Sequence, residues 1–136
     1  MVWYLVGPPT PSFGWVLIPV AICAAWLIDF FLSALIGLLA FVTEDVSGFD
    51  WVYSKLTLLL GGLLIPLDFF PAWLRDIALL TPFAYTVYGP ARCFVDPAGW
   101  RLAEIFTGQL LWILALGLLV LIAYRQSVRW LSVNGG

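Results

Sequence analysis

Hydrophobic positions gather in three long runs along the chain, and charged residues lie mainly between these runs and after the last one. The first run, residues 13–42, carries a single charge, Asp29. About 20 apolar residues cross a bilayer as a helix, so this run predicts one membrane span with length to spare. Pro19 is expected to kink this helix or to mark its effective start.

The second run is shorter, because only 12 uncharged residues lie between Lys55 and Asp68. At ~1.5 Å per residue they cover about 18 Å of a ~30 Å hydrocarbon core. The span is therefore expected to begin near Trp51 and to cover residues 51–66, with Lys55 reaching out to the lipid headgroups. Pro66 is expected to end it, since proline blocks helix continuation.

Residues 70–95 contain Pro71, Pro82 and Pro90, yet they are rich in aromatic side chains and poor in the residues typical of exposed loops. Each proline removes a backbone donor, so the stretch predicts short broken helices at the bilayer surface. Non-helical backbone at membrane depth must be buried in protein or line a wet cavity. We therefore expect a broken, partly re-entrant helical hairpin in contact with other protein.

The third run gives the clearest span, because residues 105–124 carry no charge. Its helix is expected to start at Asp96-Pro97, where an N-cap residue precedes a proline, and to span the membrane over residues 102–125. The chain is thus predicted to be an all-α integral membrane protein. It would form a single transmembrane domain over residues 1–136, with three transmembrane helices and the hairpin before the last span.

Composition agrees with a membrane location. Hydrophobic residues make up 63% of the chain and charged residues 10%, against about 25% charged in soluble domains. Membrane lipid is therefore the expected surroundings of the chain. There is also no run of basic residues, which argues against a nucleic-acid partner.

The residues for catalysis are missing. The chain has no histidine, so it lacks the usual metal ligand and the usual general base near neutral pH. Asp29 and Asp68 are the candidates for an aspartate pair, but they are expected at different depths in the membrane. Cys23 and Cys93 are interpreted as small apolar fillers. We therefore predict that the chain is not an enzyme and holds no cofactor or metal.

Two charged residues admit more than one interpretation. Asp29 is costly in the middle of a span and must face protein or water, either on a transport path or bonded to a neighbouring helix. Arg92 either pairs with Asp68, Asp76 or Asp96, or meets a ligand.

The basic residues suggest an orientation. The denser basic flank, and with it the C-terminus, is expected to be cytoplasmic, so the proline-rich hairpin would lie outside. The two flanks are Lys55, Arg125 and Arg129 on one side, and Arg75, Arg92 and Arg101 on the other.

A combination of residues before the last span resembles one known family. It comprises Gly61-Gly62, Ile65-Pro66-Leu67, Phe70-Pro71, Leu74, Ile77, Pro82-Phe83 and Pro90, followed by Gln109 and Trp112 at the opening of the last helix and Gly135-Gly136 at the end. This pattern resembles type-2 ATP-binding-cassette (ABC) export permeases, and it is most similar to the bacterial ABC-2 family transporter proteins.

The resemblance implies a subunit similar to six-span permeases that work in pairs, with a separate ATPase on the cytoplasmic side. The broken helices would cap the pathway on the outer face, in a bacterial-type inner membrane. This chain would correspond to the last three spans, a C-terminal half. Its partners would be the ATPase and a second permease subunit, identical or different.

Two functions remain open from the sequence. The first is a permease subunit of an export system, or a C-terminal fragment of one, which forms the substrate pathway. The second is a non-transporting three-span scaffold or assembly subunit of a membrane complex. The candidate pathway or gating residues are Asp29, Pro66, Asp68, Pro71, Arg92 and Gln109.

Overall fold

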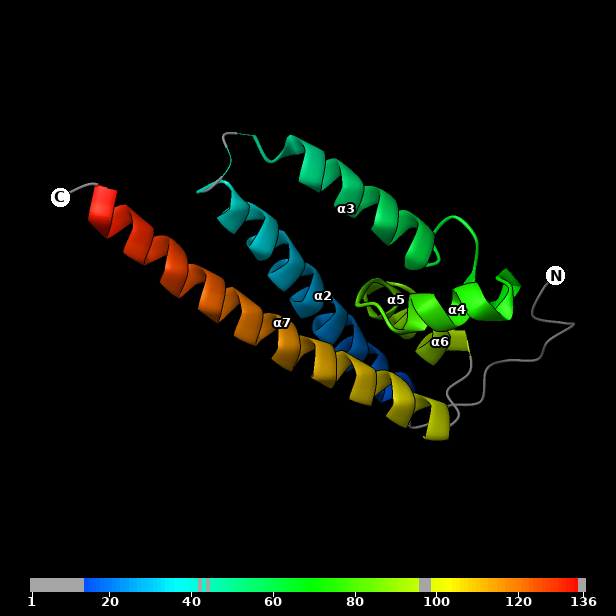
Figure 1. Ribbon diagram of the computed structural model, residues 1–136. Helices are drawn as coiled ribbons and strands as arrows, with labels where there is room; N and C mark the ends of the chain where they lie inside the picture. Colours follow the sequence, from blue (N-terminus) through cyan, green and yellow to red (C-terminus); the bar gives the residue numbers. More distant parts are fainter. Residues whose placement is uncertain (1–13, 42, 44, 96–98, 135–136) are drawn as a thin grey trace, which may run out of the picture.

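The computed structural model describes residues 14–41, 43, 45–95 and 99–134, and all regular elements in these ranges are helices (Figure 1). The predicted all-α class is confirmed for this part of the chain. In chain order the elements are α2 (Gly14–Leu39), α3 (Ser47–Leu60), the short 3-10 helix η1 (Leu67–Phe69), α4 (Ala72–Leu79), α5 (Phe83–Thr86), α6 (Tyr88–Val95) and α7 (Gly99–Asn134).

Two long helices, α2 and α7, form the frame of the molecule. They pack together and run in the same direction, while α3 runs back in the opposite direction (Figure 1). Within them, Val16–Leu39 and Leu102–Val128 are long and apolar enough to cross a bilayer. Near Gly117 of α7 the two helices are in ordinary packing contact, since a Cβ built at this glycine would lie 3.4 Å from the Phe31 ring of α2.

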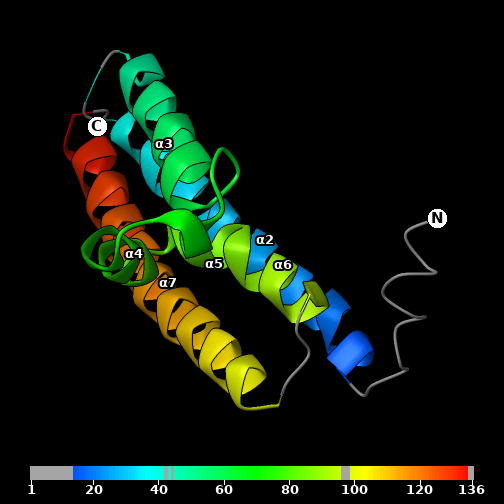
Figure 2. The ribbon, with the colours of Figure 1, turned by 90° about the vertical axis from the view of Figure 1, so that its right-hand side faces the viewer.

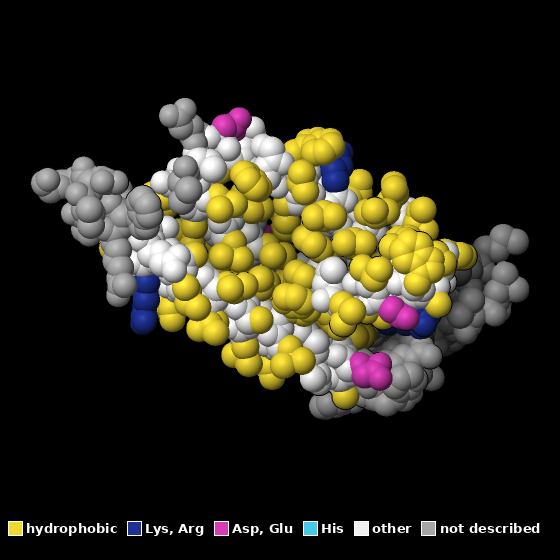
Figure 3. Space-filling model, viewed as in Figure 1, with side chains coloured by type: hydrophobic (Ala, Val, Ile, Leu, Met, Phe, Trp, Pro, Cys, Tyr) yellow, Lys and Arg dark blue, Asp and Glu magenta, His cyan; other side chains and the backbone are white. Residues whose placement is uncertain are grey.

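Most large hydrophobic side chains on this frame point outward. Trp26 and Phe30 of α2 are exposed, and so are Leu111 and Leu114 of α7. Figure 3 shows hydrophobic side chains over the middle of the visible face and charged ones near its margins. An apolar surface of this extent suits lipid or other protein rather than water.

The end of α3 corrects the prediction about Pro66. The helix begins at Ser47 and ends at Leu60, six residues before that proline, so the predicted end at residue 66 is wrong. The physical reason is Gly62, whose φ of 78° reverses the chain. Its N–H bonds the carbonyl oxygen of Leu59 at 3.3 Å, which closes the helix before Pro66 is reached.

The length of α3 sets it apart from the frame. Its 14 residues cover about 21 Å at ~1.5 Å each. Among the described residues two helices, not three, are long and apolar enough for a membrane span. At its start, hydrogen bonds from the side chain and backbone of Ser47 lower the pKa of the Asp45 carboxyl. Further along, the Lys55 ammonium lies 5.5 Å from the centroid of the Trp51 ring.

The stretch after α3 is divided into short helices, as the prolines predict. Pro66, Pro71 and Pro82 directly precede η1, α4 and α5. Pro90 lies in the first turn of α6, where a missing N–H deprives the helix of no internal hydrogen bond. Each proline therefore helps to start a helix, and none interrupts one.

Two small cores hold these pieces in position. Leu67, Ala78 and Ala84 join η1, α4 and α5 in one core, against which Tyr88 of α6 also packs. The other core consists of Ala21, Cys93 and Leu102, with Leu17, Ile18, Ile105 and Phe106 packed around it. It attaches α6 to both long helices, and Figure 2 shows α6 lying along α2. The hairpin is thus fixed to the frame through α6.

The long helices differ from their predicted bounds in two respects. α2 continues through Pro19, which lies inside the helix. The apolar segment of α7, Leu102–Val128, ends beyond the predicted residue 125, and the helix itself continues to Asn134. The predicted N-cap at Asp96-Pro97 lies outside the described residues.

Replacing Gly62 by alanine should destabilise the protein. A side chain at positive φ costs about 1–2 kcal/mol, and the added Cβ would meet Leu67 Cδ1 at 2.7 Å. Gly62→Ala is therefore expected to lower the melting temperature in detergent by several degrees. Gly37→Ala is the matched control, because a Cβ at Gly37 meets nothing within 4 Å. Equal melting temperatures for the two variants would contradict the role given to Gly62.

Candidate functional site

Gln109 is the most deeply buried polar side chain among the described residues, with 1% of its surface exposed. Its Nε2 donates to the backbone oxygen of Ala21 at 2.9 Å and to that of Tyr85 at 3.2 Å. One amide therefore connects α7 to α2 and to the hairpin helix α5. Its Oε1 is buried without a partner in the described structure. Sequence reasoning selected Gln109 as a polar group at the opening of the last span.

Two glycines make room around this amide. A Cβ at Gly108 would come within 2.2 Å of the Tyr85 ring, and one at Gly89 would meet Ile105 at 3.3 Å and lie 4.0 Å from Gln109 Nε2. The absence of side chains at both positions lets α5 and α6 approach α7 closely enough for the Gln109 bonds to form.

Asp29 lies on α2 and is partly buried. Its Oδ1 accepts a hydrogen bond from the hydroxyl of Tyr53 on α3. Of the two interpretations offered by the sequence, a bond to a neighbouring helix is therefore present. This bond satisfies one carboxylate oxygen and links α2 to a helix that has no buried residue of its own.

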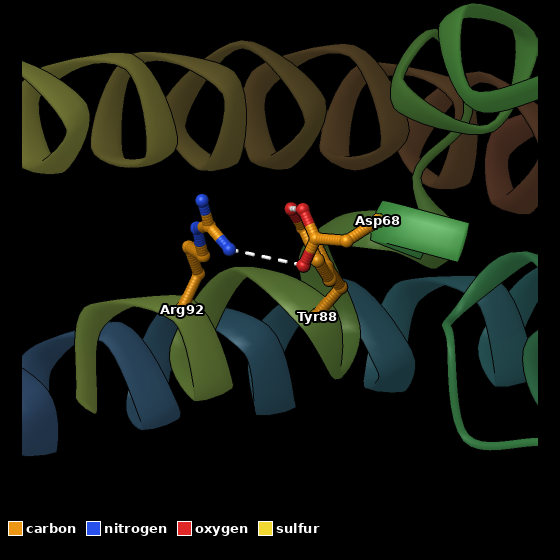
Figure 4. A network of polar contacts seen from close by, with 3 residues as sticks. All are labelled: Asp68, Tyr88 and Arg92. Carbon is orange, nitrogen blue, oxygen red and sulfur yellow. Dashed lines mark hydrogen bonds and ion pairs between the residues drawn. The ribbon is translucent and has the colours of Figure 1, made fainter. Parts of the chain in front are cut away.

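Asp68 and Arg92 form the ion pair of the described structure (Figure 4). Arg92 Nη1 lies 2.9 Å from Asp68 Oδ2, and the Tyr88 hydroxyl donates to Asp68 Oδ1 at 3.2 Å. Tyr88 and Arg92 are four residues apart and so share one face of α6. Partial burial raises the pKa of Tyr88 above its ordinary value. Together they join η1 to α6.

This network borders a cleft of about 480 Å³ between the hairpin and α7. The lining includes Arg75 of α4 and Glu104 of α7, and neither makes an ion pair with another described residue. Tyr85, whose carbonyl accepts from Gln109, also lines the cleft. The cleft therefore offers charges of both signs and two phenol rings beside an apolar frame.

The candidate pathway or gating residues predicted from the sequence fall into three groups in the structure. Asp68 and Arg92 meet directly, and Gln109 joins their surroundings through Tyr85. Asp29 does not line that cleft. Pro66 and Pro71 lie on the backbone on either side of η1, where they set helix starts.

Several residues of the site were not identified from the sequence, namely Tyr53, Arg75, Tyr85, Tyr88 and Glu104. For Tyr88 a signal was present, because it stands one helical turn before Arg92. Tyr53 gave none, because a tyrosine near a helix start is also expected from membrane-interface anchoring. The contact of Tyr85 with Gly108 depends on how the hairpin folds back.

Two apolar helices with outward-facing side chains, together with polar groups bonded to one another between the helices, suit a helical membrane protein. The chain belongs to the ABC-2 family transporter proteins, whose sequence profile matches residues 8–135. It is therefore a multi-pass membrane protein and a permease component of an ABC-type transport system. The family expected from the sequence is thereby confirmed. No curated protein and no solved structure matches the chain.

Replacing Gln109 by leucine should loosen the hairpin. Loss of the two bonds from Nε2 leaves the Ala21 and Tyr85 carbonyls with fewer partners, at an expected cost of about 1–3 kcal/mol. Cys93 reports on this change, since it is buried between the hairpin and the frame while Cys23 is exposed. In a Cys23→Ala background, Gln109→Leu should raise the rate at which a maleimide modifies Cys93.

Gln126→Leu is the control for this experiment, because Gln126 lies exposed on the same helix. It should leave the rate of Cys93 modification unchanged. If Gln109→Leu also leaves that rate unchanged, the amide does not hold the hairpin in position.

Proposed function

We propose that the chain forms part of the substrate pathway of an export system, with a separate cytoplasmic ATPase supplying the energy. The observation that carries this proposal is the broken hairpin attached through Gln109 to two apolar helices. Irregular backbone beside membrane spans is tolerated where it is enclosed by protein or lines a cavity. Here a cleft of about 480 Å³ with charged groups adjoins it.

A three-crossing arrangement fits the directions of the helices. α2 and α7 run the same way and α3 runs back, so the hairpin and the beginnings of α2 and α7 would share one side of the membrane (Figure 1). Because α3 is about 9 Å shorter than a ~30 Å core, the hairpin would enter the membrane where α3 ends. The hairpin is then partly re-entrant, and residues 1–136 form one transmembrane domain.

The positions of the basic residues favour a topology in which the hairpin lies on the outer side of a bacterial-type inner membrane. Arg125 follows the uncharged residues 105–124 of α7, at the end of the frame away from the hairpin, and Arg129 comes one turn later in the sequence. The positive-inside tendency then puts this end, and the C-terminus, in the cytoplasm. An ATPase would act from that side.

The outward-facing apolar surface is suited to contact with another membrane protein. On α7, Leu111, Leu114 and Leu118 are exposed to whatever surrounds the frame. Besides lipid, a second permease subunit, identical or different, would cover part of this surface.

Within the pathway, we assign gating to the Asp68–Arg92 pair. The two side chains are 44% and 27% exposed, so the pair contributes only about 0.2–1 kcal/mol and can open at small cost. Pro66 and Pro71 flank the backbone that carries Asp68 and would limit how η1 moves. Gln109 would act as the fixed point of the hairpin, and Asp29 would face the pathway deeper in the membrane.

Co-purification tests the permease role. The tagged chain, solubilised in a mild detergent, should bring down an ATPase with a P-loop in a fixed ratio, and ATP should change the thermal stability of the complex. Recovery of other membrane subunits without any ATPase would favour the scaffold function instead. The control is an unrelated tagged membrane protein of similar size from the same cells.

The proposed topology predicts which engineered cysteines react on intact cells. In a Cys23→Ala, Cys93→Ala background, Ala72→Cys should react with a membrane-impermeant maleimide, because Ala72 is exposed on the hairpin. Phe41→Cys, exposed beyond the other end of α2, should react only after lysis. The reverse pattern would place the hairpin in the cytoplasm. Ala84→Cys is a burial control, since Ala84 is 0% exposed and should stay unreactive in both conditions.

A further inference from the structure

One carboxylate oxygen of Asp29, within the apolar helix α2, is left for binding a ligand. Its Oδ1 accepts the bond from Tyr53, and Oδ2 has no partner in the described part of the chain. The described lysine and arginine side chains make no ion pair with it. A carboxylate in an apolar span is expensive unless a proton or a cation accompanies it.

Two grooves meet at this carboxylate. One, of about 420 Å³, runs between α2, α3 and the hairpin and includes Thr57 and Thr86 in its lining. The other, of about 430 Å³, follows the outer face of α2 and includes Phe30 and Ser33. Asp29 and Trp26 line both grooves. The ligand-accessible side of Asp29 is therefore an extended apolar surface with a few polar atoms.

Trp26 adds a second feature that favours positive charge. It is 78% exposed, so its indole face is open to a ligand rather than packed in the interior. The faces of aromatic rings attract cations, and tryptophan does so most strongly.

The other residues that line the grooves argue against anions and metal ions as ligands. Neither groove is lined by lysine or arginine, so an anion has no counter-charge there. The described residues hold no cluster of three or more metal-ligating side chains, and hard metal ions need several oxygen ligands. Mostly apolar walls with one charge match a ligand that is itself mostly apolar with one charge.

We propose that Asp29 and Trp26 bind a lipophilic organic cation, with its charge beside the carboxylate and its apolar body along the grooves. This inference deepens the proposed export function, on which it rests, because it names the class of substrate. The Tyr53 hydrogen bond orients the carboxylate toward the groove, and the exposure of Trp26 leaves a route from the lipid. A cation already dissolved in the bilayer can reach the site sideways.

Binding of tetraphenylphosphonium to the full chain in lipid nanodiscs tests the proposal. Tetraphenylborate has nearly the same shape and the opposite charge, so it separates charge recognition from partition into lipid. Saturable phosphonium binding above that of empty nanodiscs is expected, with no saturable borate binding. Asp29→Asn keeps an oxygen for the Tyr53 hydroxyl and removes the charge, and it should weaken phosphonium binding at least tenfold.

A second pair of variants separates recognition from folding. Trp26→Leu should also weaken phosphonium binding severalfold, and its exposure means that the fold does not depend on it. The matched controls are Asp76→Asn and Trp73→Leu, which change an exposed acid and an exposed tryptophan on α4 outside both grooves. Both should bind as the unmodified chain does.

Three results would overturn the proposal: no saturable phosphonium binding, equal binding of the borate, or full affinity in both Asp29→Asn and Trp26→Leu. The measurement needs no ATPase and no transport, so its failure leaves the permease role untouched. Conversely, phosphonium binding without ATPase co-purification would separate the cation site from export.

Discussion

The hairpin of this protein depends on the amide of Gln109. Its Nε2 bonds the backbone of α2 through Ala21 and the backbone of α5 through Tyr85, so one side chain joins three helices. In an apolar environment such a bond has little competition from water, and a polar group left unpaired is costly. Side-chain volume enforces the same arrangement, since Gly108 and Gly89 leave the gaps that α5 and α6 occupy. A packing constraint and a polar constraint thus select the same hairpin position.

Much of the fold follows from the hydrophobic pattern and the prolines. Two apolar runs gave the frame helices, and the prolines at 66, 71 and 82 gave the starts of short helices. The end of α3 did not follow, because both Gly62 and Pro66 can stop a helix and the backbone reversal at the glycine comes first.

The candidate site was predictable in its residue types and less so in its pairings. Arg92 had several acidic candidates, and the choice of Asp68 depends on η1 turning back toward α6. Asp29 was identified by its cost within a span, but its partner Tyr53 lies on another helix, α3, and the sequence does not show which residue of α3 faces α2. Single residues that break the local pattern are visible in a sequence. The partners that compensate them come from other elements, so they require the tertiary arrangement.

The contrast between the two polar sites indicates where the hairpin can move. At Gln109 the bonds are buried and replaceable only by equivalent polar partners, so this end of the hairpin is fixed. At Asp68 and Arg92 the pair is partly exposed, and water or a charged ligand can substitute for either member. The Asp68–Arg92 contact is therefore easier to break than the Gln109 bonds, although the apolar core of Leu67, Ala78 and Ala84 still holds η1 and α4 against α5. Loss of this ion pair would change the cleft lined by Arg75 and Glu104 and leave the packing of α2 against α7 intact.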